Sequence, residues 1–353
     1  MIARVPAPAT IADPAALAAH CAALISGREV APRDMRFGPS VIRVRFHGFS
    51  ARTRYDDALA PASASDDPPL FAIDVIDGSA CGIGRPRLDW KQADFGAKRI
   101  VPGWSDARRT TYLLRSEGGF ALADWTARRA VIWLPSAEAV PWYERAAPFR
   151  WLFDALAARQ GMAMLHAAAI GLRGRGVLLA GRGGAGKSTL ALACLGRGFD
   201  YVADDYCLLS ATPQPTAYGL YRTAKWKKDA LVVPGWLAAQ PPHALDDTQQ
   251  KNVVRIDLLK PGQLADRLTI TAIVMPVIAD VPEARLDAIT GSSALGPLAA
   301  STLAQAELDD PRPIALMGRL ARAVPAYRLR MPRDPERSVS AIEAWLAQGE
   351  DRA

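Results

Sequence analysis

The stretch that decides the fold is Gly181-Arg182-Gly183-Gly184-Ala185-Gly186-Lys187-Ser188, which matches the phosphate-binding pattern G-x-x-x-x-G-K-[ST]. The small apolar run at 176–180 before it is typical of a buried parallel strand, and 189–195 after it favours a helix. Glycines let backbone N–H groups surround phosphates, where the N-terminus of a helix adds partial positive charge. The stretch therefore predicts a site for ATP.

Each residue type in this loop has an expected role. Lys187 should reach the β- and γ-phosphates, and the Ser188 hydroxyl should hold Mg²⁺. The expected nucleotide contacts are Gly181, Gly183, Gly184, Ala185, Gly186, Lys187, Ser188 and Thr189.

Two adjacent carboxylates follow the loop after a single helix. That helix should end near Arg197-Gly198, and the run at 199–203 returns as a strand into Asp204-Asp205. One carboxylate can face a metal ion and the other an acceptor hydroxyl. An ordinary turn that closes a strand is the alternative interpretation of the pair.

At this point the chain resembles the catalytic core of the HPr kinase/phosphorylase family. The similar pieces, in the same order and spacing, are Leu165-His166, the strand from Gly174 to Gly181, the loop to Ser188, the helix to Gly198, and Ala203-Asp204-Asp205. The resemblance implies a P-loop kinase core of the type shared with phosphoenolpyruvate carboxykinases, with a mixed α/β sheet.

The resemblance also implies roles for three side chains. Asp204 corresponds to the base that takes the proton of a serine hydroxyl, and Asp205 to the acid at the metal. His166 corresponds to the active-site histidine before the loop strand, although a lone histidine in an apolar stretch is more often a core residue.

The chain departs from this family at two places. Thr189 stands where the family has Glu, and its later glycine-rich signature has no counterpart here, so the phosphorylase activity stays open. Three short pieces are similar instead to the HPr-kinase-related kinases of lasso-peptide clusters: 153–166, 225–231 and 327–329. This wider resemblance implies that the acceptor is a serine of a small ribosomally made precursor peptide.

Composition limits the other classes of protein. The 353 residues are half apolar, which is enough for a sizeable core and about two domains. With no membrane-length apolar run and no signal-like start, we expect a cytoplasmic protein that does not enter membranes. The four scattered cysteines favour reduced thiols rather than a zinc site. The net charge of +7 is spread along the chain, which favours steering of ATP or an acidic peptide over nucleic-acid binding.

Residues 1–145 differ in pattern from the catalytic part. Alternating runs at 41–46, 70–76, 112–115, 119–124 and 130–134 predict a small antiparallel β domain, with a loop over 58–69. This domain is either structural or a platform that binds a peptide by strand addition. Four of its tryptophans could form a peptide surface but more often belong to a core: Trp90, Trp104, Trp125 and Trp133.

Residues 146–353 are expected to form the catalytic domain. We predict helices over 148–160 and 338–347, a helical region over about 301–323, and strands over 206–209 and 270–275. A phosphoryl-transfer site needs basic residues to stabilise the transferring group. The candidates are Lys225, Lys251 and Arg255.

The sequence thus favours an ATP- and Mg²⁺-dependent serine kinase acting on a peptide. Two other classes stay open, namely a kinase or carboxykinase-like enzyme of small molecules and a non-catalytic protein that responds to a nucleotide. The family resemblance also permits a homo-oligomer.

Overall fold

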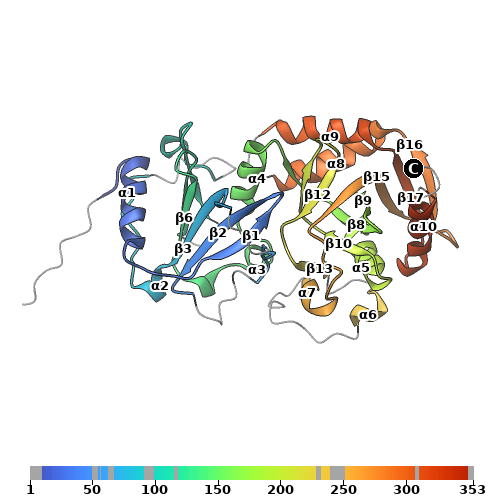
Figure 1. Ribbon diagram of the computed structural model, residues 1–353, viewed down its shortest axis with the longest axis horizontal. Coiled ribbons are helices and arrows are strands. Elements are labelled where there is room, and N and C mark those ends of the chain that lie inside the picture. Colours follow the sequence, from blue (N-terminus) through green and yellow to red (C-terminus); the bar gives the residue numbers. More distant parts are fainter. Residues whose placement is uncertain are drawn as a thin grey trace, which may run out of the picture. The chain divides into compact units, whose positions relative to one another are not determined.

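The computed structural model describes residues 10–49, 55, 57–62, 67–90, 99–114, 118–227, 232–238, 251–306 and 310–348. The chain forms two compact units (Figure 1). Unit 1 comprises residues 1–57 and 61–145, and unit 2 comprises 58–60 and 146–353. At the start of the predicted loop over 58–69, Ala58 to Ala60 form no helix or strand; they are buried and belong to unit 2, where the Ala60 N–H donates to the Leu220 carbonyl at 3.1 Å. Residues 63–66 of that loop lie outside the described residues.

Among its described residues, unit 1 contains a six-stranded sheet of order β1-β2-β3-β6-β5-β4. The strands are β1 (Arg33–Phe37), β2 (Ser40–His47), β3 (Phe71–Asp77), β4 (Arg109–Leu113), β5 (Phe120–Asp124) and β6 (Arg129–Leu134). The helical segments are α1 (Pro14–Ile25), α2 (Gly78–Cys81), η2 (Pro102–Trp104), η3 (Ala137–Ala139) and α3 (Trp142–Arg145).

The sheet of unit 1 is mixed, so the predicted antiparallel domain is wrong in this respect. Strand β3 runs parallel to both β2 and β6, whereas the outer pairs are antiparallel. Parallel neighbours need long crossover connections. Residues 48–70 connect β2 to β3, and residues 78–128 connect β3 to β6. A prediction that treats consecutive strands as hairpins does not include these crossovers.

Helix α1 packs on this sheet, and its apolar side chains contribute to a hydrophobic core of unit 1. Its Leu17 and Cys21 lie in one apolar cluster with Phe120, Trp104 and Trp133. Both tryptophans are buried and Trp90 packs against the cluster, which confirms the core interpretation for these three. Asp13 caps α1 by accepting from the Ala15 and Ala16 N–H groups, each at 2.8 Å.

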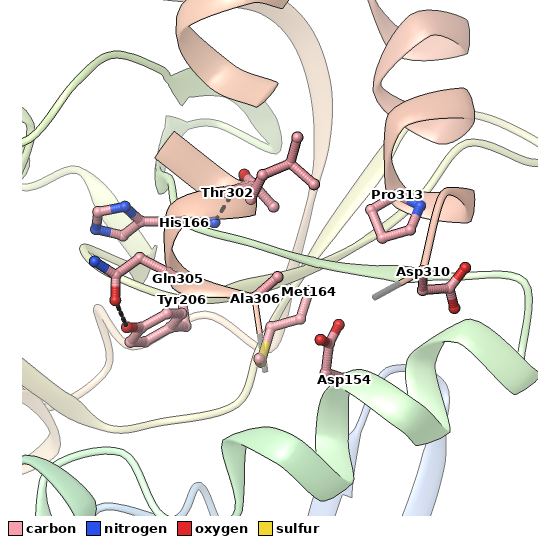
Figure 2. A pocket seen from close by; sticks show the side chains of 10 residues that line it. Asp154, Met164, His166, Tyr206, Thr302, Gln305, Ala306, Asp310 and Pro313 are labelled. Atoms are coloured by element: carbon pink, nitrogen blue, oxygen red, sulfur yellow. Dashed lines mark hydrogen bonds between the residues drawn. The ribbon is translucent and has the colours of Figure 1, made fainter. Parts of the chain in front are cut away.

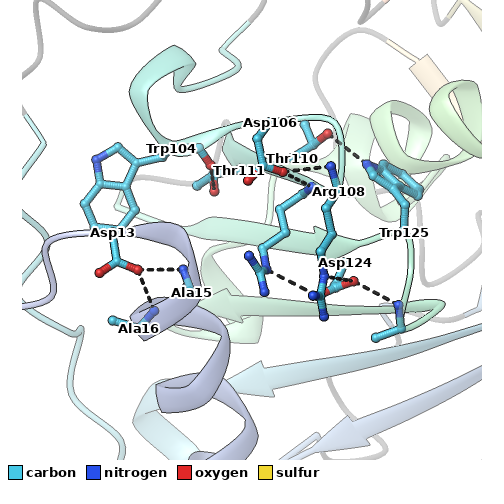
Figure 3. A network of polar contacts seen from close by, with 12 residues as sticks. Asp13, Ala15, Ala16, Trp104, Asp106, Arg108, Thr110, Thr111, Asp124 and Trp125 are labelled. Carbon is cyan, nitrogen blue, oxygen red and sulfur yellow. Dashed lines mark hydrogen bonds and ion pairs between the residues drawn. The ribbon is translucent and has the colours of Figure 1, made fainter.

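A network of polar contacts links the start of β4 to the end of β5 in unit 1 (Figure 3). Arg108 and Arg109 both pair with Asp124, at 3.1 and 3.2 Å, and the Trp125 indole donates to the Thr110 hydroxyl at 3.0 Å. Asp124 also accepts from the Ala127 N–H at 2.8 Å, so this network fixes the turn after β5.

Unit 2 is a mixed α/β unit around a nine-stranded sheet of described residues. Its path runs β10-β8-β9-β15-β12-β11-β7, and β17 joins β15 to β16. The strands are β7 (Ala163–Leu165), β8 (Ala168–Leu172), β9 (Arg175–Leu179), β10 (Asp200–Ala203), β11 (Cys207–Ser210), β12 (Thr216–Gly219), β15 (Arg267–Ile278), β16 (Arg285–Ile289) and β17 (Ala326–Met331). A separate ribbon pairs β13 (Thr223–Lys227) with β14 (Lys251–Arg255).

Helices cover both faces of this sheet. They are α4 (Arg150–Arg159), α5 (Lys187–Gly196), α6 (Gly235–Ala238), α7 (Ile256–Leu259), α8 (Gly291–Gln305), α9 (Arg312–Ala323) and α10 (Glu336–Ala347). Alternate residues of β9 enter two separate cores. Val177 and Leu179 pack with α5 and α10, whereas Leu178 packs with α8 and α9. Strand β9 runs parallel to β15, as its apolar run predicts, but antiparallel to its other neighbour, β8.

The predicted helices are confirmed at α4, α5 and α10, and within the predicted helical region at 301–323 the described residues form the end of α8 and all of α9. Helix α8 begins earlier, at Gly291, where the Thr290 side chain caps it, and it ends at Gln305. Helix α9 then begins at Arg312, after Pro311. Proline is favoured in the first turn of a helix, where Pro313 lies in α9, although α8 also contains Pro297 in its interior. None of the helices in the described part of the chain combines the length and apolar character that crossing a membrane requires.

Candidate active site

The glycine-rich loop connects β9 to α5, as expected. Helix α5 begins at Lys187 directly after Gly186, whose φ of +90° is left-handed. The Lys187 side chain is buried, and its Nζ donates to the carbonyls of Gly181 at 2.8 Å and Arg182 at 3.3 Å. Burial lowers the pKa of Lys187, and the charges of both carboxylates of the pair partly oppose this. The ammonium therefore lies beneath the loop and near the acid pair.

The last glycine of the loop is tightly enclosed. A Cβ at Gly186 would lie 2.5 Å from the Met331 Cε, whereas a Cβ at Gly184, with a φ of +82°, would meet no atom within 4 Å. Both substitutions to alanine strain the backbone, by about 1–2 kcal/mol, but only Gly186→Ala also displaces Met331. We expect urea unfolding to show a larger loss of stability for Gly186→Ala than for the control Gly184→Ala. Equal losses would show that the Met331 contact is unimportant.

Strand β10 brings the acid pair to the start of α5. The Ser188 hydroxyl donates to the backbone carbonyl of Asp204 at 3.4 Å, so the hydroxyl that is predicted to bind the metal lies beside the acid pair. Asp204 is only 3% exposed, and its Oδ2 accepts from the Lys225 N–H at 3.1 Å. Burial, and then the neighbouring charge of Asp205, raise the pKa of the Asp204 carboxyl. A carboxylate with a raised pKa is a stronger base.

The other carboxylate is held between two basic side chains. Asp205 Oδ1 lies 2.9 Å from His166 Nε2, and its Oδ2 lies 2.8 Å from Lys225 Nζ. His166 Nδ1 in turn lies 2.7 Å from the Ser301 hydroxyl. The backbone N–H of His166 donates to the Thr302 hydroxyl at 3.3 Å. Because a carboxylate only accepts, Nε2 carries the proton and Nδ1 can accept from Ser301.

The two carboxylates thus have opposite electrostatic environments. Burial alone would raise the pKa of Asp205, but the Lys225 charge and the His166 hydrogen bond hold that pKa well below its usual range. The pKa of Lys225 is raised, because the nearby Asp205 outweighs the effect of burial. Environments that separate two carboxyl pKa values in this way are typical of functional sites.

The Asp205 interaction predicts a pH dependence of stability. A carboxyl whose pKa is lower in the folded state binds more protons when unfolded, so stability falls as the pH decreases. Below about pH 5, the range where a model carboxyl with a pKa near 4 begins to protonate, the wild type should lose stability more steeply than Asp205→Asn. Urea unfolding between neutral and acidic pH measures this. The control is Asp287→Asn. It also removes a carboxylate from an ion pair, with Arg330, but at a position far in the sequence from the glycine-rich loop. Parallel curves for wild type and Asp205→Asn would contradict the assignment.

The three basic candidates have different surroundings. Lys225 contacts the acid pair directly, as described above. Lys251 faces Lys227 across the β13–β14 ribbon, and its charge contributes to the lowered pKa of Lys187, after burial. Arg255 pairs with Asp257 at 2.6 Å. Residues 228–231, part of the segment used for the wider resemblance, lie outside the described residues.

Two hollows lie near the acid pair, and Tyr206 lines both of them. One is lined by Ala146, Ala203, Asp204, Asp205, Tyr206, Tyr221, Thr223 and Lys225. The other is lined by Asp154, Met164, His166, Tyr206, Thr302, Leu303, Gln305, Ala306, Asp310 and Pro313 (Figure 2). Asp204 and His166 therefore line different hollows, and Tyr206 lines both.

Sequence reasoning missed Tyr206 and its partners on two helices. The Tyr206 hydroxyl lies 2.8 Å from Arg150 Nη1 on α4 and 3.1 Å from Gln305 Oε1 on α8. A tyrosine directly after the acid pair was the available signal, but its partners lie 56 and 99 residues away in the chain.

The oxygen groups of this site fit a magnesium ion. Among the described residues, no cluster of three or more His, Cys, Asp or Glu side chains gathers to hold a metal by itself. Mg²⁺ is usually held by one or two protein oxygens together with phosphate oxygens and water. Ser188 and Asp205 would provide the protein oxygens beside a bound triphosphate.

Comparisons with known proteins add little. No family model matches the chain, and no curated protein matches it. Among solved structures, the chain is similar to the HPr(Ser) kinase/phosphatase from Coxiella burnetii, with 14% identity and a TM-score of 0.28. The alignment covers 53% of this chain and 90% of that chain. Because this likeness is slight, any function must be inferred from the site residues themselves.

Proposed function

We propose that unit 2 is an ATP- and Mg²⁺-dependent kinase that phosphorylates a serine hydroxyl, with a small ribosomally made peptide of the lasso type as the acceptor. The observation that carries the proposal is the juxtaposition of the phosphate loop with an acid pair whose pKa values are shifted in opposite directions. Such an arrangement suits a reaction that needs both a phosphate site and a base.

The loop would bind the nucleotide. Its backbone N–H groups and the N-terminus of α5 favour phosphate oxygens. Lys187 has three N–H donors, of which two reach loop carbonyls, so one is available for a phosphate. Lys251, whose charge acts on Lys187, would help to stabilise the transferring group. When bound to Ser188 and Asp205, Mg²⁺ would neutralise charge on the β- and γ-phosphates.

Asp204 would act as the base. Its carboxylate takes the proton of the acceptor hydroxyl while the serine oxygen forms a bond to the γ-phosphorus. The bond between that phosphorus and the β–γ bridging oxygen breaks, and its electron pair leaves with ADP. The Lys225 ammonium, which is paired with Asp205, keeps that second carboxylate ionised beside the base.

The test compares classes of acceptor in one assay. ADP release is measured with ATP and Mg²⁺ in the presence of serine peptides, of matched alanine peptides, or of free hydroxy metabolites. The proposal predicts turnover that requires the serine peptides. Turnover with free metabolites alone would instead indicate a small-molecule kinase, and tight ATP binding without turnover would indicate a nucleotide-responsive binding protein.

A further inference from the structure

Tyr206 contacts both partners of Asp205. It follows the acid pair, is 7% exposed, and precedes β11. The Lys225 Nζ lies 5.6 Å from the centroid of its ring, within the range of a cation–π interaction. The His166 ring lies 5.6 Å away, centroid to centroid, and is tilted by 34°. One aromatic ring therefore adjoins both groups that hold the carboxylate.

The ring itself is anchored at its hydroxyl. Arg150 donates to the Tyr206 oxygen, and the hydroxyl donates to Gln305 Oε1 beside His166 (Figure 2). The Arg150 guanidinium also lies 5.2 Å from the ring centroid. These contacts come from α4 and α8, two helices on separate segments of the chain. The ring is thus fixed by elements that do not belong to the acid pair.

We propose that Tyr206 is a positioning residue that keeps His166 and Lys225 in place on Asp205. Lys225 is only 7% exposed, so its ammonium depends on the protein groups around it, and its side chain has four rotatable bonds that these contacts must fix. The ring provides that contact for Lys225, and it limits rotation of the His166 imidazole. A structural role alone would not require the ring to contact both partners of one carboxylate.

The first test observes His166 directly. The chain has four histidines, so selective ¹⁵N-histidine labelling gives a simple NMR spectrum. His166 should show a slowly exchanging Nε2–H resonance, which His166→Asn assigns. His47 is an internal control, because its Nε2 lies 3.0 Å from Asp74 in unit 1 and its side chain is buried. We expect Tyr206→Leu to broaden or shift the His166 resonance and to leave that of His47 unchanged. Tyr206→Phe, which keeps the ring, should preserve both resonances.

An unchanged His166 resonance in Tyr206→Leu would overturn the proposal. If circular dichroism or loss of the His47 resonance shows that this variant has not folded, Tyr206→Met then decides the question, because the flexible methionine side chain removes the ring but fills part of its space. The proposal predicts a broadened or shifted His166 resonance in Tyr206→Met too, and an unaltered one would contradict it.

The second test rests on the proposed function and measures kcat separately from KM. Tyr206→Leu should lower kcat about tenfold, as expected for loss of one cation–π contact of about 1–2 kcal/mol, with the KM for ATP within about twofold. Tyr206→Phe should restore most of kcat, and Tyr218→Leu on β12 is the matched control. A rise in KM with unchanged kcat would contradict a positioning role. Absence of turnover in the wild type would refute the kinase proposal, whereas the NMR result would still decide the role of Tyr206.

Discussion

Lys187→Met is expected to weaken ATP binding about ten- to a hundredfold, since a hydrogen bond from a charged group contributes about 1.5–3 kcal/mol. The Nζ of Lys187 lies against the loop carbonyls of Gly181 and Arg182, where a β- or γ-phosphate would complete its third hydrogen bond. Methionine keeps most of the buried stem and removes the charge. Turnover should fall with binding, because in the proposed reaction the same ammonium would stabilise charge on the transferring group.

Titration calorimetry with ATP and Mg²⁺ measures this effect. Lys260→Met is the matched control, because Lys260 lies over the Trp236 ring at 4.9 Å and has no part in the loop. Circular dichroism establishes that both variants are folded. If Lys187→Met bound ATP as tightly as the control, the loop would not be the phosphate site.

Asp204→Asn is expected to lower kcat about a hundred- to ten-thousandfold, the usual contribution of a positioned base. Asparagine has nearly the same shape, and its carbonyl oxygen can still accept from the Lys225 N–H, so the fold should survive. The amide cannot take a proton at neutral pH. Affinity for ATP should stay within about threefold of the wild type, because the substitution removes no phosphate contact.

Single-turnover kinetics separates these two effects. Asp200→Asn, on the same strand β10, is the control for removing an acid from this part of the sheet. A fast chemical step in Asp204→Asn would show that another group accepts the proton.

The parts of the site that are local in the chain could be predicted from the sequence. Strand β9, the loop, α5 and β10 follow one another without interruption, so pattern and spacing place Lys187 and Ser188 beside the acid pair. The partners of Asp205 could not be derived in this way. His166 was suggested only by a family resemblance, and its partner Ser301 lies 135 residues further along the chain.

The sheet of unit 1 and helices α8 and α9 show the same limit. Alternation located strands β2, β3 and β6, but it carries no information on which strands are neighbours, and β6 inserts beside β3 rather than at an edge. The helical pattern at 301–323 also does not show that α8 ends at Gln305 and that α9 begins at Arg312, or that α8 starts earlier, at the Thr290 cap. Register and pairing are decided by packing between distant segments.

The most direct test of the central claim is intact-mass spectrometry of a serine-containing precursor peptide incubated with the protein, ATP and Mg²⁺. The wild type should add one phosphoryl group, the matched alanine peptide should gain none, and Asp204→Asn should leave the peptide unmodified. A peptide that stays unmodified with the wild type while ATP is bound, or one that Asp204→Asn modifies at the wild-type rate, would contradict the account.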